Sequence, residues 1–95
     1  MSELLVRSLE IASDYVDAAG PDHPVVRRLV AANAAWAGIE TDDWMTSAQA
    51  VHDADRSPDE TSAHLAVLVA GTQDLADDLG LPWRPTPAMR AVLDR

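Results

Sequence analysis

Residues 57–81 constrain the fold of this chain more than any other stretch, because both ends of one long helix are encoded there. Ser57 is a favoured N-cap residue, Pro58 fits the first helical position, and Glu60 can close a capping box with Ser57. Gly80 is the residue type that most often ends a helix, since it adopts a left-handed conformation without strain. The segment therefore predicts one helix between these signals.

This predicted helix, at about 58–79, has two different long faces. Apolar positions follow the spacing of one helical face along its whole length, in Leu65, Leu68, Val69, Thr72, Leu75, Ala76 and Leu79. The opposite face is acidic at both ends and apolar in the middle, through Ala63, Ala66, Val67 and Ala70. A helix that is apolar all round should be covered on more than one side. The cover is either another helix of the same chain or a second copy of the protein.

Capping residues and apolar spacing predict further helices on both sides of this one. The first spans Glu3–Ala19, with Ser2 as its cap, and the second spans Pro24–Ala37, capped by Asp22 or His23. A third helix has a thin apolar stripe that includes Trp44, and Thr41 or Asp42 caps it. A short last helix follows Thr86, and Met89, Val92 and Leu93 dock it on the bundle. We expect an all-α fold in one domain, 1–95: a bundle of four main helices plus a short irregular helix, organised around the long central helix.

One polar residue interrupts the apolar stripe of the second helix. Asn33 lies in line with Val26, Leu29 and Val30. A buried amide without partners costs about 1–3 kcal/mol, so this position should carry a hydrogen bond. The bond is either an ordinary structural one to a neighbouring helix or a register device across a symmetric interface.

Composition excludes several classes of function. The formal net charge is −9 and the chain contains no lysine, which disfavours direct binding to nucleic acid or to an anionic membrane. Between residues 40 and 60 seven carboxylates accompany one arginine, Arg56. The absence of cysteine excludes disulfides and thiolate metal sites. Apolar runs are too short for a membrane span, so we expect a cytoplasmic protein.

The richest polar stretch lies between residues 52 and 64. His52, Glu60 and His64 are weak candidates for a transition-metal site, because Glu60 and His64 share one helix face. Asp53 and Asp55 begin a pattern like that of a calcium loop, but later positions depart from it. A solvated junction between two helices explains the same residues, and we expect no bound metal or other cofactor.

Two pairs of carboxylates, each three residues apart, raise the question of an enzyme. The ADDLGL ending of the long helix resembles the closing helix of the all-α nucleotide pyrophosphatases, which hold magnesium on such pairs. Here, however, Asp14, Asp17, Asp74 and Asp77 lie opposite the apolar stripes and hence outside the bundle. Trp36-Ala37-Gly38 is similar to the signature of the WXG-type secretion substrates, but the break at Pro58 does not fit their long hairpin. No catalytic residue is predicted.

These observations favour a non-enzymatic interaction or regulatory protein that acts through its helical surfaces, as a homodimer. The predicted seam uses small apolar side chains, Ala63, Ala66, Val67 and Ala70, and the turn with Trp83 and Arg84 is a second candidate contact. The alternative is an acidic decoy of the phage-inhibitor type, which occupies the basic nucleic-acid-binding groove of a partner protein. A metal-assisted enzyme is a remote third hypothesis.

Overall fold

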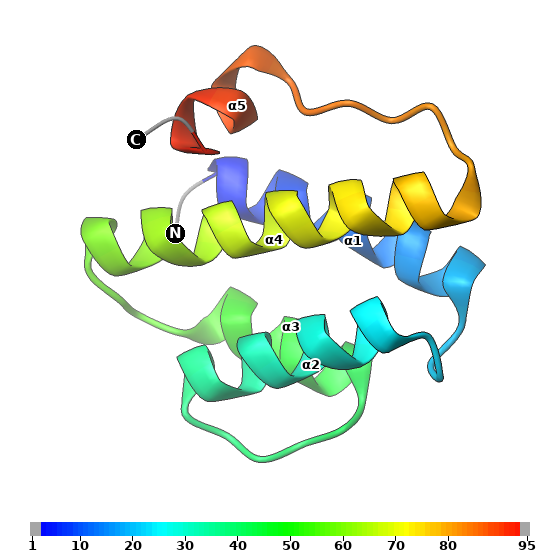
Figure 1. Cartoon of the computed structure of the whole chain (residues 1–95). Coiled ribbons are helices and arrows are strands. Elements are labelled where there is room, and N and C mark those ends of the chain that lie inside the picture. The colour runs from blue at the N-terminus through cyan, green and yellow to red at the C-terminus, as the bar shows by residue number, and fades with distance from the viewer. Residues whose placement is uncertain (1–2, 94–95) are drawn as a thin grey trace.

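The computed structural model describes residues 3–93, which contain helices and no strands. The helices are α1 (Glu3–Ala19), α2 (Pro24–Ala37), α3 (Trp44–Asp53), α4 (Pro58–Leu79) and α5 (Pro87–Leu93) (Figure 1). The all-α prediction is therefore confirmed. The predicted cap Ser2 lies outside the described residues. Within them, no helix is both long and apolar enough to cross a membrane.

The ends of α4 lie where the sequence predicts them. The backbone N–H of Glu60 donates to Ser57 Oγ at 3.2 Å, and Gly80 ends the helix with a φ of +69°. The Ser57 hydroxyl in turn donates to Glu60 Oε1 at 3.0 Å. The carboxylate of Glu60 therefore accepts from the Ser57 hydroxyl, and not from the backbone N–H of Ser57 as in a standard capping box. Because these bonds are local, they are readable from sequence.

The prediction for the start of α3 is wrong by one residue. Asp43, and not Thr41 or Asp42, caps this helix, because its Oδ2 accepts hydrogen bonds from the N–H of Thr46 at 2.9 Å and from Thr46 Oγ1 at 2.8 Å. These bonds hold the pKa of Asp43 below its ordinary value, the backbone bond having the larger effect. The Thr41 hydroxyl instead accepts from the N–H of Asp43 and stabilises the preceding turn.

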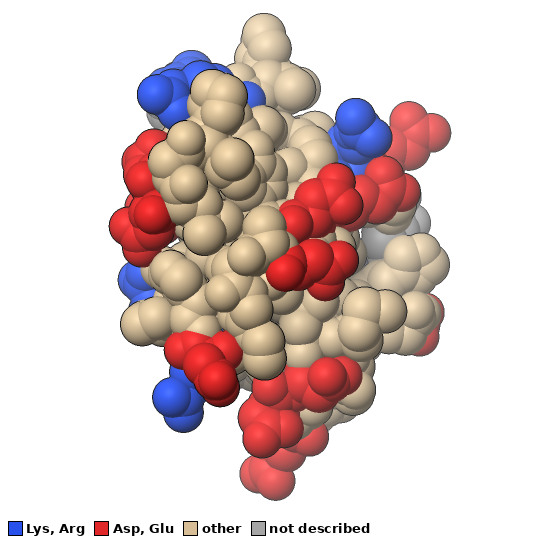
Figure 2. Space-filling model, turned by 90° about the vertical axis from the view of Figure 1, so that its right-hand side faces the viewer, with Lys and Arg blue, Asp and Glu red and all other residues tan. Residues whose placement is uncertain are grey.

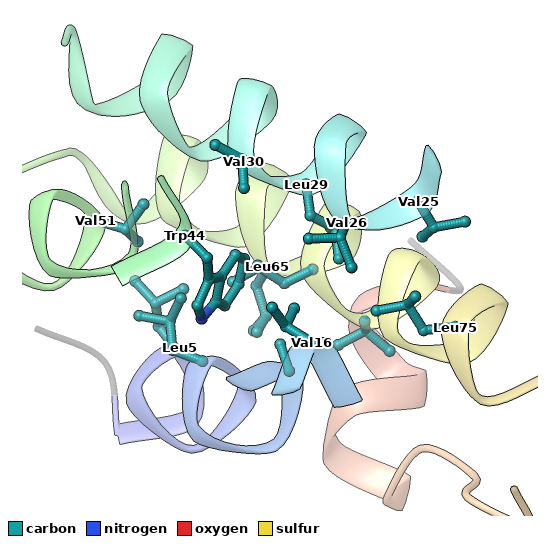
Figure 3. Packing of buried hydrophobic residues seen from close by; sticks show 14 of the residues in the cluster. Leu5, Val16, Val25, Val26, Leu29, Val30, Trp44, Val51, Leu65 and Leu75 are labelled. Carbon is teal, nitrogen blue, oxygen red and sulfur yellow. The ribbon is translucent and has the colours of Figure 1, made fainter. Parts of the chain in front are cut away.

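Helix α4 packs against α1, α2 and α5, whereas α3 packs mainly on α2 and touches α1 only sparsely. The core between the helices is built from aliphatic side chains of every helix together with Trp44. Figure 3 shows Trp44 reaching from α3 toward α1, near Leu65 of α4. Met89 and Val92 are buried and dock α5 as predicted, but Leu93 is 36% exposed and adds little to this contact.

Helices α2 and α4 run antiparallel and touch along their whole common length. From one end to the other, the contacts join His23 to Asp78, Arg28 to Asp74, Leu29 to Gly71, Asn33 to His64 and Trp36 to Glu60. Residue numbers rise along α2 as they fall along α4, which defines the antiparallel arrangement. This pair of helices positions the candidate surfaces described below.

Candidate interaction surfaces

The outer face of α4 is open to solvent in its middle. Ala63 and Ala70 are exposed, and Val67 is 44% exposed, so no segment between residues 3 and 93 covers these side chains. Ala66 differs from the other three predicted seam residues, because it is half-buried against the core. The exposed part of the predicted seam is therefore a short stripe of three small apolar side chains.

A shallow groove of about 260 Å³ runs beside this stripe, between α4 and α2. Val67, Ala70 and Gly71 line it from α4, and Val25 and Leu29 line it from α2. Its rim carries an exposed ion pair, with Arg28 Nη2 at 3.8 Å from Asp74 Oδ2. At Gly71 the backbone of α4 comes close to the side chain of Leu29, so that even a Cβ atom would meet it. This glycine is a packing residue that the apolar pattern of α4 does not reveal.

The turn with Trp83 and Arg84 is tied back to the helices. The Trp83 ring is half-buried, with its centroid 5.9 Å from that of Tyr15 on α1. Arg84 Nη1 donates to the carbonyl oxygen of Trp83 at 2.8 Å and lies 3.8 Å from Asp77 Oδ1. One side of Trp83 is therefore engaged by its own chain, and the exposed Arg84 is the more accessible of the two candidate contacts.

The three weak metal candidates do not converge. Among residues 3–93 no group of three or more acidic or histidine side chains is placed to hold a metal ion. His64 Nε2 lies 2.7 Å from Asn33 Oδ1, and the carboxylate of Glu60 accepts from Ser57. His52 is exposed, with its Nδ1 at 3.3 Å from Asp53 Oδ1. Each of these side chains has a separate local role.

His64 belongs to a buried polar contact between α4 and α2. Its ring stacks on Trp36, with centroids 4.8 Å apart and planes 11° apart, and only 4% of the residue is exposed. Since an amide oxygen only accepts hydrogen bonds, the Nε2 of neutral His64 carries the proton shared with Asn33. Burial lowers the pKa of His64 to about 4. The contact answers the question left open for Asn33: its oxygen is bonded within the chain, while its Nδ2 has no partner among the described residues.

Arg56 has a structural role that sequence reasoning missed. Its Nε and Nη2 donate to the carbonyl oxygen of Trp36, at 3.2 and 3.1 Å, and its guanidinium lies 5.9 Å from the centre of the Trp36 ring. Carbonyl groups in the last turn of a helix have no partner within the helix, and a cation at this end also favours the helix dipole. Arg56 therefore caps the C-terminal end of α2 from 20 residues away.

Carboxylates dominate the surface charge. All seven acidic residues between positions 40 and 60 are exposed, in two groups separated by α3: Glu40, Asp42 and Asp43 before it, and Asp53, Asp55, Asp59 and Glu60 at its end and beyond. Figure 2 shows one side of the molecule, on which acidic groups surround an uncharged area and outnumber the basic groups. Asp14, Asp17, Asp74 and Asp77 are also exposed, so the paired carboxylates point away from the core.

No protein-family model, no curated protein and no solved structure matches this chain.

Proposed function

We propose that this chain is a small, non-enzymatic interaction protein that self-associates as a homodimer through the outer face of α4. In this proposal α4 is the organising helix of the bundle: one face belongs to its own core and the other to the seam. The observation that carries the proposal is the exposure of Ala63, Val67 and Ala70 in the middle of a helix that is otherwise polar on this side. The groove beside α2 extends this apolar area.

Small side chains suit such a seam, because they let two helices approach closely and gain van der Waals contact. Acidic residues at both ends of α4 oppose it, since Asp59 and Glu60 at one end, and Asp77 and Asp78 at the other, are exposed. Two copies that each carry a charge of −9 repel one another, and salt screens that repulsion. The homodimer should therefore become tighter as the salt concentration rises.

Replacing Val67 by glutamate should weaken dimerisation at least tenfold, because it adds a charge at the centre of the seam. The measurement is sedimentation velocity over a range of concentrations, together with far-UV circular dichroism to check the fold. Met45→Glu is the matched control, since it adds the same charge at an exposed position on α3 and should leave dimerisation unchanged. A wild-type protein that stays monomeric at about 50 µM would remove the dimer.

The second candidate function is that of an acidic decoy for a basic nucleic-acid-binding groove. The exposure of all seven carboxylates between residues 40 and 60 favours it, although α3 divides them into two groups. Affinity for such a partner should fall at least tenfold between about 50 and about 200 mM salt. The opposite sign of the salt effect separates this hypothesis from the homodimer.

The decoy is tested by retaining nucleic-acid-binding proteins from an extract of the native host on the immobilised chain, and by competing them off with duplex DNA. Asp55→Asn combined with Asp59→Asn should reduce retention, because both carboxylates are exposed and neither forms an ion pair with another described residue. Retention that is insensitive to salt and to DNA would eliminate the hypothesis. The remote hypothesis of a metal-assisted enzyme has no supporting cluster among residues 3–93.

A further inference from the structure

A second groove, unrelated to the outer face of α4, runs between α1 and α3. Its middle part has a volume of about 230 Å³. We define this α1–α3 groove by Val6, Leu9 and Ser13 from α1 and by Met45, Ala48 and His52 from α3. His52 also lines a larger cleft of about 590 Å³ at one end, and Met45 lines a hollow of about 250 Å³ at the other. Each end of the α1–α3 groove therefore shares a lining residue with a neighbouring hollow.

The groove exists because α3 leans on α2 and touches α1 only sparsely. Trp44 is the main link between the two helices, with its Nε1 donating to Ser13 Oγ at 3.1 Å. The Ser13 hydroxyl donates onward to the carbonyl oxygen of Leu9 at 2.9 Å. Trp44 thus fills the inner side of the gap, while the next residue, Met45, stays 70% exposed. It is the most exposed large apolar side chain in the described part of the chain.

We propose that the α1–α3 groove binds an amphipathic helix of a protein partner, with apolar residues on one face and basic residues on its flanks. The floor is apolar, through Leu9, Val6 and Ala48, and a flexible methionine at the wall adapts to different side chains. A partner helix bound in such a groove places the side chain of every third or fourth residue into it. Helix α1 has 17 residues and is about 25 Å long, which leaves room for three to four turns of a partner.

The acidic residues around the groove are the reason to expect basic residues on the flanks of the partner helix. Glu10 lines the groove beside Val6 and Leu9, and Glu3 lies about two turns before Glu10 on the same helix. Asp17, Asp42 and Asp43 surround the hollow at the Met45 end, and Asp53 lines the cleft at the His52 end. Two arginines lie near this rim: Arg7, whose Nη1 lies 3.5 Å from Glu10 Oε2, and Arg56, which lines the cleft at the His52 end and donates to the carbonyl oxygen of Trp36. Arginine or lysine residues of a partner helix therefore meet carboxylates along the groove and at both ends.

A second copy of the chain does not fit this description. Arginines occur on α1, α2 and α5. Helix α1 itself forms one wall of the groove, and the apolar residues of the other two helices are already buried in the core, including Val26 and Leu29 on α2 and Met89 and Val92 on α5. The described part of the chain therefore offers no helix that is at once basic and apolar on a free face. The partner is a different protein.

The experiment uses a synthetic amphipathic peptide of about 14 residues, with leucine on one face and lysine on the other, labelled for fluorescence anisotropy. The full-length chain should bind it, and Met45→Glu should bind it at least tenfold more weakly. Because the added carboxylate increases the net negative charge, non-specific attraction would change the affinity in the opposite direction. Met45→Leu should keep the affinity within about threefold, since volume and apolarity are retained.

Two controls separate this groove from the outer face of α4. Val67→Glu carries the same added charge and should bind the peptide as the wild type does, even where it no longer dimerises. A peptide with the same composition in scrambled order should bind at least tenfold more weakly, because it has no apolar face. Amide chemical shifts should change around Ser13, Met45 and His52 when the amphipathic peptide is added.

Three results would each overturn the proposal. The first is an absence of binding at about 100 µM wild-type protein, and the second is Met45→Glu binding as tightly as the wild type. The third is a set of chemical-shift changes confined to α2 and α4. A monomeric wild type in sedimentation would refute the homodimer without affecting the peptide result, so the two proposals fail independently.

Discussion

Replacing Gly71 by valine is expected to destabilise the protein by about 2–3 kcal/mol, because this glycine sits where α4 comes closest to α2. A Cβ atom at this position would overlap Leu29 Cδ2 and lie 3.0 Å from Leu29 Cγ. Leu29 is itself 3% exposed and packed in the core, so it cannot swing away freely. Valine has a slightly higher helix propensity than glycine, but that gain is only a few tenths of a kcal/mol.

The measurement is equilibrium unfolding in urea. Ala31→Val is the control, because it adds a larger side chain at an exposed position of α2 outside the seam and both grooves; it should change the free energy of unfolding by less than about 1 kcal/mol, chiefly through the lower helix propensity of valine. In a Leu29→Ala background, Gly71→Val should be less damaging, since the overlap is removed; the two substitutions form a double-mutant cycle. Equal stability of Gly71→Val and the wild type would contradict the observed packing.

The second large effect is a loss of stability on acidification that depends on His64. Its pKa is about 4 in the folded protein and 6.5 in the unfolded chain, so the unfolded state binds more protons between these values. The contribution of the neutral, buried His64 ring to the free energy of unfolding is fully present above pH 6.5 and is lost as the pH falls toward 4. The expected loss is about 2–3 kcal/mol.

Carboxylates contribute in the same direction at lower pH. Hydrogen bonds to the backbone and side chain of Thr46 lower the pKa of Asp43, and the side chains of Gln49 and His52 lower that of Asp53. Stability from these two groups is present above about pH 4 and is lost as pH falls through their folded pKa values. The effect of His64 on stability should therefore be measured between about pH 6.5 and about pH 4.5, where these two carboxylates do not yet titrate.

A His64→Gln variant is the control, because glutamine cannot titrate and can still donate to Asn33. Urea unfolding at several pH values should give a shallower pH dependence for this variant than for the wild type. Proton NMR titration of the His64 ring measures the pKa directly. A folded-state pKa of about 6 or higher would show that water reaches the ring between Trp36 and Asn33.

Helix limits and most caps could be predicted from this sequence, because they depend on residues a few positions apart. Ser57 with Glu60, and Gly80 at the end of α4, form such local signals. Asp43 was missed as the cap of α3 because Thr41, Asp42 and Asp43 are all acceptable residues in succession. The backbone geometry of the turn decides among them, and the sequence pattern does not contain it.

For the α4 stripe, the sequence predicted that the residues are small and apolar, but not which other helices lie beside them. Its spacing identified Ala63, Val67 and Ala70 as an apolar patch, and their exposure depends on where α2 and α5 pack. The α1–α3 groove could not be predicted at all. It exists because α3 packs on α2 and contacts α1 only sparsely, which leaves Met45 exposed.

The sequence by itself determined five helices, their apolar faces and an acidic surface, since helix propensity, capping and periodicity act over one or two turns. Only the tertiary structure decided that Asn33 bonds to His64, 31 residues away, that Arg56 caps α2, and that Gly71 receives Leu29. These contacts depend on how rigid helices are oriented, which is a balance of packing over the whole core. Helix α4 illustrates the difference: local capping residues determine where it begins and ends, and packing of the whole core determines which helices it contacts.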